Sequence, residues 1–235
     1  MKVIGIISSP HANGNGATLV RKALEGAAES GAEVQEVFLP DYRVEFCRDC
    51  QVCMKTGRCV VQDDFPKLRD MLNDADGAIF SSPTYAKAPC ARMKNLMDRL
   101  GMFAWMASTF GGKYIAAIAT AGSFGAPATA NQLAAAVRDG LFRRAYVSGT
   151  LGVSLRGQHV STMPQTLSKA RALGGRVASD IRAGRRYPLQ NLLGRLPTAI
   201  FMRPMIKQAI VKNRTAMKGV YDELVRTGVV ARSEA

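Results

Sequence analysis

Four cysteines lie close together in the first third of the chain. Cys47, Cys50, Cys53 and Cys59 have the spacing C-x2-C-x2-C-x5-C, so the four thiols fall within thirteen residues. Thiolates spaced this closely on a looping backbone suit the corners of a 4Fe-4S cluster. The same thiolates could instead hold a tetrahedral zinc ion, or no metal at all. The spacing therefore favours an iron-sulfur site and leaves these two alternatives open.

A polar turn, SSPHANGNGAT, occupies residues 8–18, directly after an apolar run. Glycine and asparagine permit tight backbone curvature. Hydroxyl and amide side chains can join the N–H groups at a helix start in holding a phosphate. The turn lacks G-x-G-x-x-G and the G-K-[ST] ending, which argues against a dinucleotide or a nucleoside triphosphate at this point. It predicts a site for a phosphate ester, the alternative being a polar turn that binds nothing.

Two more turns are expected at the same edge of a sheet. Residues 81–86 (SSPTYA) follow one apolar run, and residues 120–125 (TAGSFG) follow the next. Turns after the carboxyl ends of neighbouring parallel strands border one crevice, at the point where the strand order reverses. Tyr85 can pack near an aromatic ring there, and Pro83 would fix the turn. The three turns together predict a site for a phosphorylated aromatic ring system.

These motifs resemble those of a known family. Ser9-Pro10-His11-x-x-Gly14-Asn15 is similar to the G-S-P-R-x-x-G-N phosphate loop of the NADPH-dependent FMN reductase-like proteins, in the flavodoxin-like superfamily. Ser82-Pro83-Thr84-Tyr85 is similar to their S-P-x-Y element, which faces the isoalloxazine. The cysteine quartet resembles that of the iron-sulfur flavoproteins, which hold a 4Fe-4S cluster beside FMN.

The resemblance implies FMN as cofactor, NADPH or NADH as electron donor, and Cys47, Cys50, Cys53 and Cys59 as cluster ligands. The implied FMN contacts are Ser9, His11, Asn15, Gly16, Thr18, Pro83, Thr84, Tyr85, Ala86, Thr120, Gly122 and Ser123. His11 stands where the family usually has Arg or Lys, which would weaken phosphate binding at neutral pH. No catalytic acid or base is assigned, because the flavin carries the chemistry.

Alternating apolar runs and helix-like stretches indicate the elements that position these turns. Strands are expected at 3–7, 34–39, 77–81, 114–119 and 145–153, and helices at 16–30, 64–73, 90–107, 128–139 and 165–183. This rhythm is typical of a doubly wound parallel α/β sheet, either flavodoxin-like or Rossmann-like. The resemblance selects the flavodoxin-like form, with five parallel strands in the order 2-1-3-4-5 and a helical C-terminal appendage.

Charge divides the chain unevenly. Residues 1–155 contain 17 Lys and Arg against 14 Asp and Glu, whereas residues 156–235 contain 15 against 4. We expect an FMN-binding domain at 1–186, with a Cys-rich loop at 41–63, and a basic helical extension at 187–235. The extension could pack against the core or another subunit, lie on a membrane surface, or dock a partner. No groove-reading motif accompanies the charge, so no nucleic acid partner is expected.

The predicted function is that of an FMN-dependent NAD(P)H oxidoreductase, passing electrons to a quinone, a flavin or another acceptor. The alternative is an electron carrier reduced by a ferredoxin-like protein, without nicotinamide turnover of its own. A third reading has zinc in the Cys-rich loop and no redox role. No export signal or membrane span is recognised, so we expect a cytoplasmic protein with reduced thiols. The resemblance also implies a homodimer or homotetramer.

Overall fold

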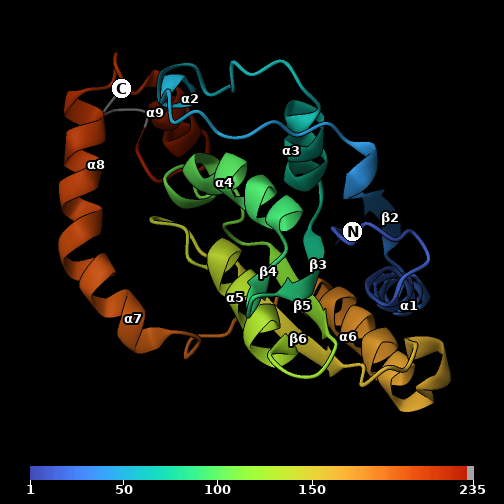
Figure 1. Cartoon of the computed structure of the whole chain (residues 1–235). Coiled ribbons are helices and arrows are strands. Elements are labelled where there is room, and N and C mark those ends of the chain that lie inside the picture. Colours follow the sequence, from blue (N-terminus) through green and yellow to red (C-terminus); the bar gives the residue numbers. More distant parts are fainter. Residues whose placement is uncertain (232–235) are drawn as a thin grey trace.

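The computed structural model describes residues 1–231 and is built around a parallel sheet (Figure 1). The parallel strands are β1 (Lys2–Ile7), β2 (Glu33–Phe38), β3 (Gly77–Tyr85), β5 (Tyr114–Ala121) and β6 (Tyr146–Ser154), in the order β2-β1-β3-β5-β6. The predicted flavodoxin-like order is therefore confirmed for the parallel strands. The predicted count of five strands is wrong by one, because a two-residue strand β4 (Ala88–Pro89) turns back antiparallel on the end of β3.

The middle strands are buried on both faces, as a doubly wound sheet requires. All eight residues of β5 are buried, and β1 has fully buried valine and isoleucine on alternate faces. The edge strand β2, by contrast, exposes Val34 to solvent. The continuous apolar runs seen in the sequence thus mark the centre of the sheet.

Two layers of helices cover the sheet. On one face lie α1 (Asn15–Glu29) and α6 (Pro164–Ala183), whose apolar sides form one core with alternate strand residues. On the other face lie α3 (Phe65–Asp74), α4 (Ala91–Trp105) and α5 (Ala126–Arg138), which form a second core. The five predicted helices match these elements to within a few residues. A short helix, α2 (Val52–Thr56), forms inside the Cys-rich segment, where none was predicted.

The C-terminal part is helical, as predicted, and leaves the body before returning to it (Figure 1). It comprises α7 (Leu192–Pro197), a π-helical stretch η3 (Thr198–Met202), α8 (Arg203–Lys212) and α9 (Lys218–Arg226). Helix α9 returns to α2 and closes a third small apolar core. Residues 232–235 of the predicted extension lie outside the described residues, and its boundary at 186 stays a prediction. No helix within residues 1–231 combines the length and hydropathy that crossing a bilayer demands.

Candidate functional site

The three turns singled out in the sequence lie at one edge of the sheet. Strand β1 pairs with β3 so that Ile7 is opposite Ser81, and β3 pairs with β5 so that Pro83 is opposite Thr120. Beyond these pairs, the Ser8 backbone N–H and hydroxyl both donate to the Ser81 carbonyl, at 3.1 and 2.8 Å. Adjacent parallel strands therefore deliver the turns 8–18, 81–86 and 120–125 to a common rim.

The turn after β1 is held in shape by its own backbone. The N–H of His11 donates to the Ser9 hydroxyl at 3.3 Å, and the N–H of Gly14 donates to the His11 carbonyl at 3.0 Å. A side chain at Gly16 would meet the Ser81 hydroxyl, 3.2 Å from its Cβ, so glycine allows α1 to begin close to β3. No side chain caps this helix start in the described chain. Its first N–H groups are thus available to an anion.

Two of the predicted phosphate contacts also make hydrogen bonds within the protein. The Asn15 amide oxygen accepts from the Val160 N–H at 2.7 Å, and the Thr18 hydroxyl donates to the Gly14 carbonyl at 3.1 Å. Both side chains therefore help to shape the turn, and their contact with a phosphate stays a prediction. His11 is exposed at the surface of the turn.

The turn after β3 is a tight hairpin with a strained backbone. Thr84 and Tyr85 pair with Pro89 and Ala88 of β4, and the two residues between them, Ala86 and Lys87, have φ of 48° and 63°. Two consecutive residues at positive φ match a type I′ hairpin turn, which usually takes Asn or Gly. Non-glycine residues in this conformation carry strain that tends to occur at functional sites.

Thr84 and Tyr85 have side chains at this hairpin that could contact a ligand. The Thr84 hydroxyl is buried and finds no hydrogen-bond partner among residues 1–231. A buried hydroxyl without a partner is costly unless a ligand or water satisfies it. The Tyr85 ring is exposed, so one face of it is open to a planar ligand.

The turn after β5 is the third of the turns at this edge of the sheet. Thr120 is buried at the strand end, whereas Gly122 and Ser123 are exposed. A Cβ at Gly125 would lie 3.5 Å from the Thr84 methyl group, so this turn contacts the β3 hairpin directly. The Gly122 carbonyl accepts from the Arg156 N–H at 2.7 Å, which ties the turn to the end of β6.

These features fit a flavin mononucleotide. An uncapped helix start and the buried Ser9 hydroxyl suit the phosphate, and the orphaned Thr84 hydroxyl beside an exposed tyrosine suits a heteroaromatic ring. A pocket of about 390 Å³ lies between the first turn, the β3 hairpin and the Cys-rich segment, lined by Ser8, Pro10, Phe46, Tyr85 and Cys90 among others. Cys90 is buried there, with its sulfur 3.2 Å from the Ser8 hydroxyl.

The cysteine quartet lies in the Cys-rich segment, whose Phe46 lines the pocket beside the rim. All five cysteines within residues 1–231 are free thiols, with Cys47 and Cys50 exposed and Cys53 and Cys59 half-buried. Burial, and then the neighbouring Cys59, Cys50 and Cys47, raise the pKa of Cys53. Each of the other three thiols is therefore near enough to Cys53 to affect its pKa. In residues 1–231, however, no three His, Cys, Asp or Glu side chains are arranged as a formed metal site.

A buried arginine is aimed at this quartet. Arg99 of α4 donates from Nη2 to the Cys59 sulfur at 3.3 Å and forms an ion pair with Asp63, Nη1 to Oδ2, at 2.6 Å. Its guanidinium also lies over the Phe65 ring. Arg99 is not among the predicted site residues, although its position in the sequence indicates a buried partner. Arg99 lies on the apolar face of α4, between Leu96 and Phe103, where a charged residue needs a buried partner.

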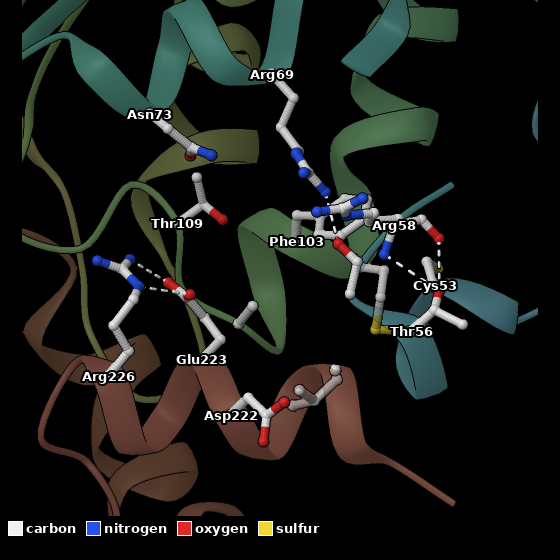
Figure 2. Close-up of a pocket in the computed structure, with 15 residues that line it drawn as sticks. Cys53, Thr56, Arg58, Arg69, Asn73, Phe103, Thr109, Asp222, Glu223 and Arg226 are labelled. Carbon is white, nitrogen blue, oxygen red and sulfur yellow. Dashed lines mark hydrogen bonds and ion pairs between the residues drawn. The ribbon is translucent and has the colours of Figure 1, made fainter. Parts of the chain in front are cut away.

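A second pocket, of about 400 Å³, borders Cys53 (Figure 2). Side chains from α3, α4 and α9 point toward it, among them Arg69, Phe103 and Glu223. Arg69 stacks over Phe103 and donates to the Gly57 carbonyl at 2.7 Å. Helix α9 forms one wall because Gly219 contacts Gly57, where an added Cβ would come 2.0 Å from the backbone nitrogen. Helix α9 thus packs on the α2 end of the Cys-rich segment, next to Cys53, and leaves Cys47 and Cys50 exposed.

The sheet order and the three convergent turns define a flavodoxin-like α/β protein. Residues 1–155 match the model of a family described as NADPH-dependent FMN reductase. The chain belongs to this family.

Known proteins with sequence similarity are iron-sulfur flavoproteins. The chain is 41% identical over 99 residues to one from Methanocaldococcus jannaschii, covering 42% of this chain and 51% of the relative. It is 32% identical over 127 residues to one from Archaeoglobus fulgidus, covering 54% of this chain and 57% of the relative. The chain thus spans about half the length of these curated relatives.

Among solved structures, a flavone reductase superposes with a TM-score of 0.64 at 21% identity, over 77% of this chain and 63% of that one. At this level of identity the likeness supports the fold alone.

Proposed function

We propose that this chain is an FMN-dependent oxidoreductase that takes electrons from NADPH or NADH and delivers them to a small acceptor. The observation that carries the proposal is the convergence of three turns on one rim, where the buried Thr84 hydroxyl lacks a partner within residues 1–231. Membership of the FMN reductase family supports the cofactor and suggests the nicotinamide donor. Bound FMN would supply hydride acceptance and one-electron transfer.

The chain's own groups would bind and orient this cofactor. The N–H groups of Asn15 and Gly16 and the Ser9 hydroxyl would hold the phosphate, and the dipole of α1 would favour its negative charge. Thr84 would donate to a heteroatom of the ring, and Tyr85 would pack on the ring face. The exposed N–H groups of Gly122 and Ser123 would reach the ring edge from the third turn.

We propose that Cys47, Cys50, Cys53 and Cys59 hold a 4Fe-4S cluster. The sequence spacing, the electrostatic proximity of the four thiols and the names of the curated relatives support this assignment. Arg99 would offset part of the cluster's negative charge and raise its reduction potential through the Cys59 sulfur. A small acceptor such as a quinone or free flavin could reach this segment through the pocket beside Cys53.

A carrier reduced by a ferredoxin-like protein is the second candidate. The cysteine segment is largely exposed and the C-terminal third carries most of the net positive charge, which would suit an acidic redox partner. Assembly into a homodimer or homotetramer stays a prediction.

The test of the redox role is performed anaerobically. Purified protein is titrated with FMN, and the loaded protein is then mixed with NADPH, NADH or reduced ferredoxin in separate cells. Bleaching of the flavin absorbance by a nicotinamide supports the reductase. Reduction by ferredoxin alone supports the carrier, and no FMN binding rejects both.

The test of the cluster uses iron and sulfide reconstitution followed by metal analysis and EPR. Cys53→Ser should lose bound iron. Cys90→Ser, a buried cysteine outside the quartet, should retain it. Equal iron content in the two variants would reject the proposed ligand set, and zinc in place of iron would reject the cluster.

A further inference from the structure

The segment from α7 to α8 carries a row of exposed apolar side chains. Leu193 and Phe201 are 84% and 71% exposed, and nothing in residues 1–231 covers them. We define the apolar arm face as Leu189, Leu193, Leu196, Ile200, Phe201 and Met205. Leu189 lies in the turn before α7, and Phe201 directly follows Ile200. The steps Leu193–Leu196–Ile200 and Phe201–Met205 are of three or four residues, which places these side chains along one broad side of the helical stretch. Residues 192–212 are helical throughout, a length on the order of 30 Å.

The opposite side of the arm is tied to the body. Gln190 exchanges two hydrogen bonds with the Val147 backbone of β6, at 3.0 and 2.7 Å. Arg203 donates to the Leu141 carbonyl at 2.6 Å, and Ile210 is fully buried in the third core. The arm is therefore held at both ends and in its middle, with the apolar arm face turned outward. Figure 1 shows it running along one border of the molecule, away from the sheet.

The arm segment itself carries positive charge, although Asn191, directly before α7, donates to the Asp139 carboxylate of the body at 2.9 Å. Residues 181–221 contain nine Lys and Arg and no Asp or Glu. Arg186 is exposed before the arm, next to Arg185, which forms an ion pair with Asp180 at 3.0 Å, and Lys212 and Arg214 are exposed after it. An exposed apolar helix face with cations at both ends suits the interface of an anionic bilayer.

We propose that the arm seats this protein on an anionic membrane surface, with the apolar arm face in the headgroup layer. The cations at both ends of the arm meet the lipid phosphates. A second copy is a poorer occupant, because a symmetric dimer through this face would set two cation-rich segments against each other. The inference rests on the surface alone and does not depend on the proposed redox function.

The experiment is flotation of the full chain with vesicles. Vesicles of phosphatidylcholine mixed with phosphatidylglycerol should carry the protein upward, and vesicles of phosphatidylcholine alone should carry much less. Raising the salt from about 0.1 M to about 1 M, which shortens the screening length from about 10 Å to about 3 Å, should release most of it. Equal binding to both vesicle types, or no flotation, would overturn the proposal.

Variants locate the contact. Leu193→Glu combined with Phe201→Glu should lose most of the bound fraction, and Lys212→Glu combined with Arg214→Glu should lose a large part of it. Val34→Glu, an exposed apolar residue of β2 far from the arm in sequence, is the control and should float like the parent. Thermal unfolding of each variant checks that the body is intact. If a variant fails to fold, the salt dependence of the parent protein's flotation still tests the proposal.

Light scattering of the same samples distinguishes the other occupant. Suppose that the parent protein is oligomeric without vesicles and fails to float, and that the Leu193→Glu, Phe201→Glu variant is monomeric. The face would then be a subunit interface, and the lipid assignment would be overturned. A parent that floats and whose oligomeric state is unchanged by the variant supports it.

Discussion

Arg99 and Asp63 form an ion pair from which solvent is almost completely excluded, the two side chains being 1% and 0% exposed. Arg99 also donates to the Glu45 carbonyl at 2.7 Å and to the Cys59 sulfur. Asp63 accepts from the backbone N–H groups of Glu45 and Phe65. One pair of charges therefore fastens both ends of the Cys-rich segment to α4.

Removing the cation should be strongly destabilising. Arg99→Ala leaves the Asp63 carboxylate buried without its partner, a change that typically costs about 3–5 kcal/mol of unfolding free energy. Lys94→Ala is the matched control, because its ion pair with Asp98 is exposed and should contribute no more than about 0.5 kcal/mol. Urea denaturation of both variants measures the difference, and similar losses would contradict the role given to burial.

Asp63 should also make stability depend on pH in the acid range. Burial alone would raise the pKa of Asp63, but hydrogen bonds from Arg99 and two backbone N–H groups outweigh it and hold the pKa below the usual 3.8. A carboxyl whose pKa is lower in the folded state stabilises the fold above its unfolded pKa. This contribution is lost as the pH falls below about 3.8 and through the folded pKa.

Asp63→Asn should therefore flatten the acid limb of the stability curve. Its unfolding free energy should be lower than that of the parent at neutral pH and should fall less steeply below pH 3.8. Denaturation at a series of pH values tests this. Parallel curves for parent and variant would show that Asp63 does not carry the dependence.

Thr84→Val tests the predicted ring contact. In the free protein the Thr84 hydroxyl has no partner within residues 1–231, so its removal should leave stability unchanged or slightly improved. With FMN bound, the lost hydrogen bond should weaken binding about two- to tenfold, for a net contribution of about 0.5–1.5 kcal/mol. Quenching of flavin fluorescence gives the affinity.

The control for Thr84 is Ser148→Ala. Ser148 also has a buried hydroxyl without a partner in the described chain, but it lies near the start of β6, away from the rim. Its replacement should leave FMN affinity unchanged. If Thr84→Val binds FMN as the parent does, Thr84 makes no contact with the ring.

Gly219→Ala should disturb the cover over the cysteine segment. Its Cβ would come 2.0 Å from the Gly57 nitrogen, so α9 must move away from α2, at a cost of about 1–3 kcal/mol. Gly101→Ala is the control, because no atom lies within 4 Å of its Cβ position in α4. Alanine there should raise stability by up to about 1 kcal/mol. Faster alkylation of Cys53 in Gly219→Ala alone would locate the disturbance.

Much of the fold could be predicted from local patterns. The apolar runs of β1 and β5 and the spacing of the helices mark a doubly wound sheet, because a strand buried on both faces leaves a continuous apolar stretch. The loop motifs around Ser9 and Pro83 indicated one rim, because parallel strands end at a common edge of the sheet. The strand β4 was missed because a two-residue hairpin at Ala86 and Lys87 lacks the usual Asn-Gly signal.

The remaining features depend on contacts between residues far apart in the chain. The Asn15 amide oxygen accepts from the Val160 N–H, and Arg99 donates to Asp63 and Cys59. No local spacing in the sequence reveals these pairings. The outward direction of the apolar arm face likewise follows from where Gln190 and Ile210 attach. Periodicity in the sequence shows that a helix has an apolar side, but long-range packing decides whether that side is buried in the core or left for a partner.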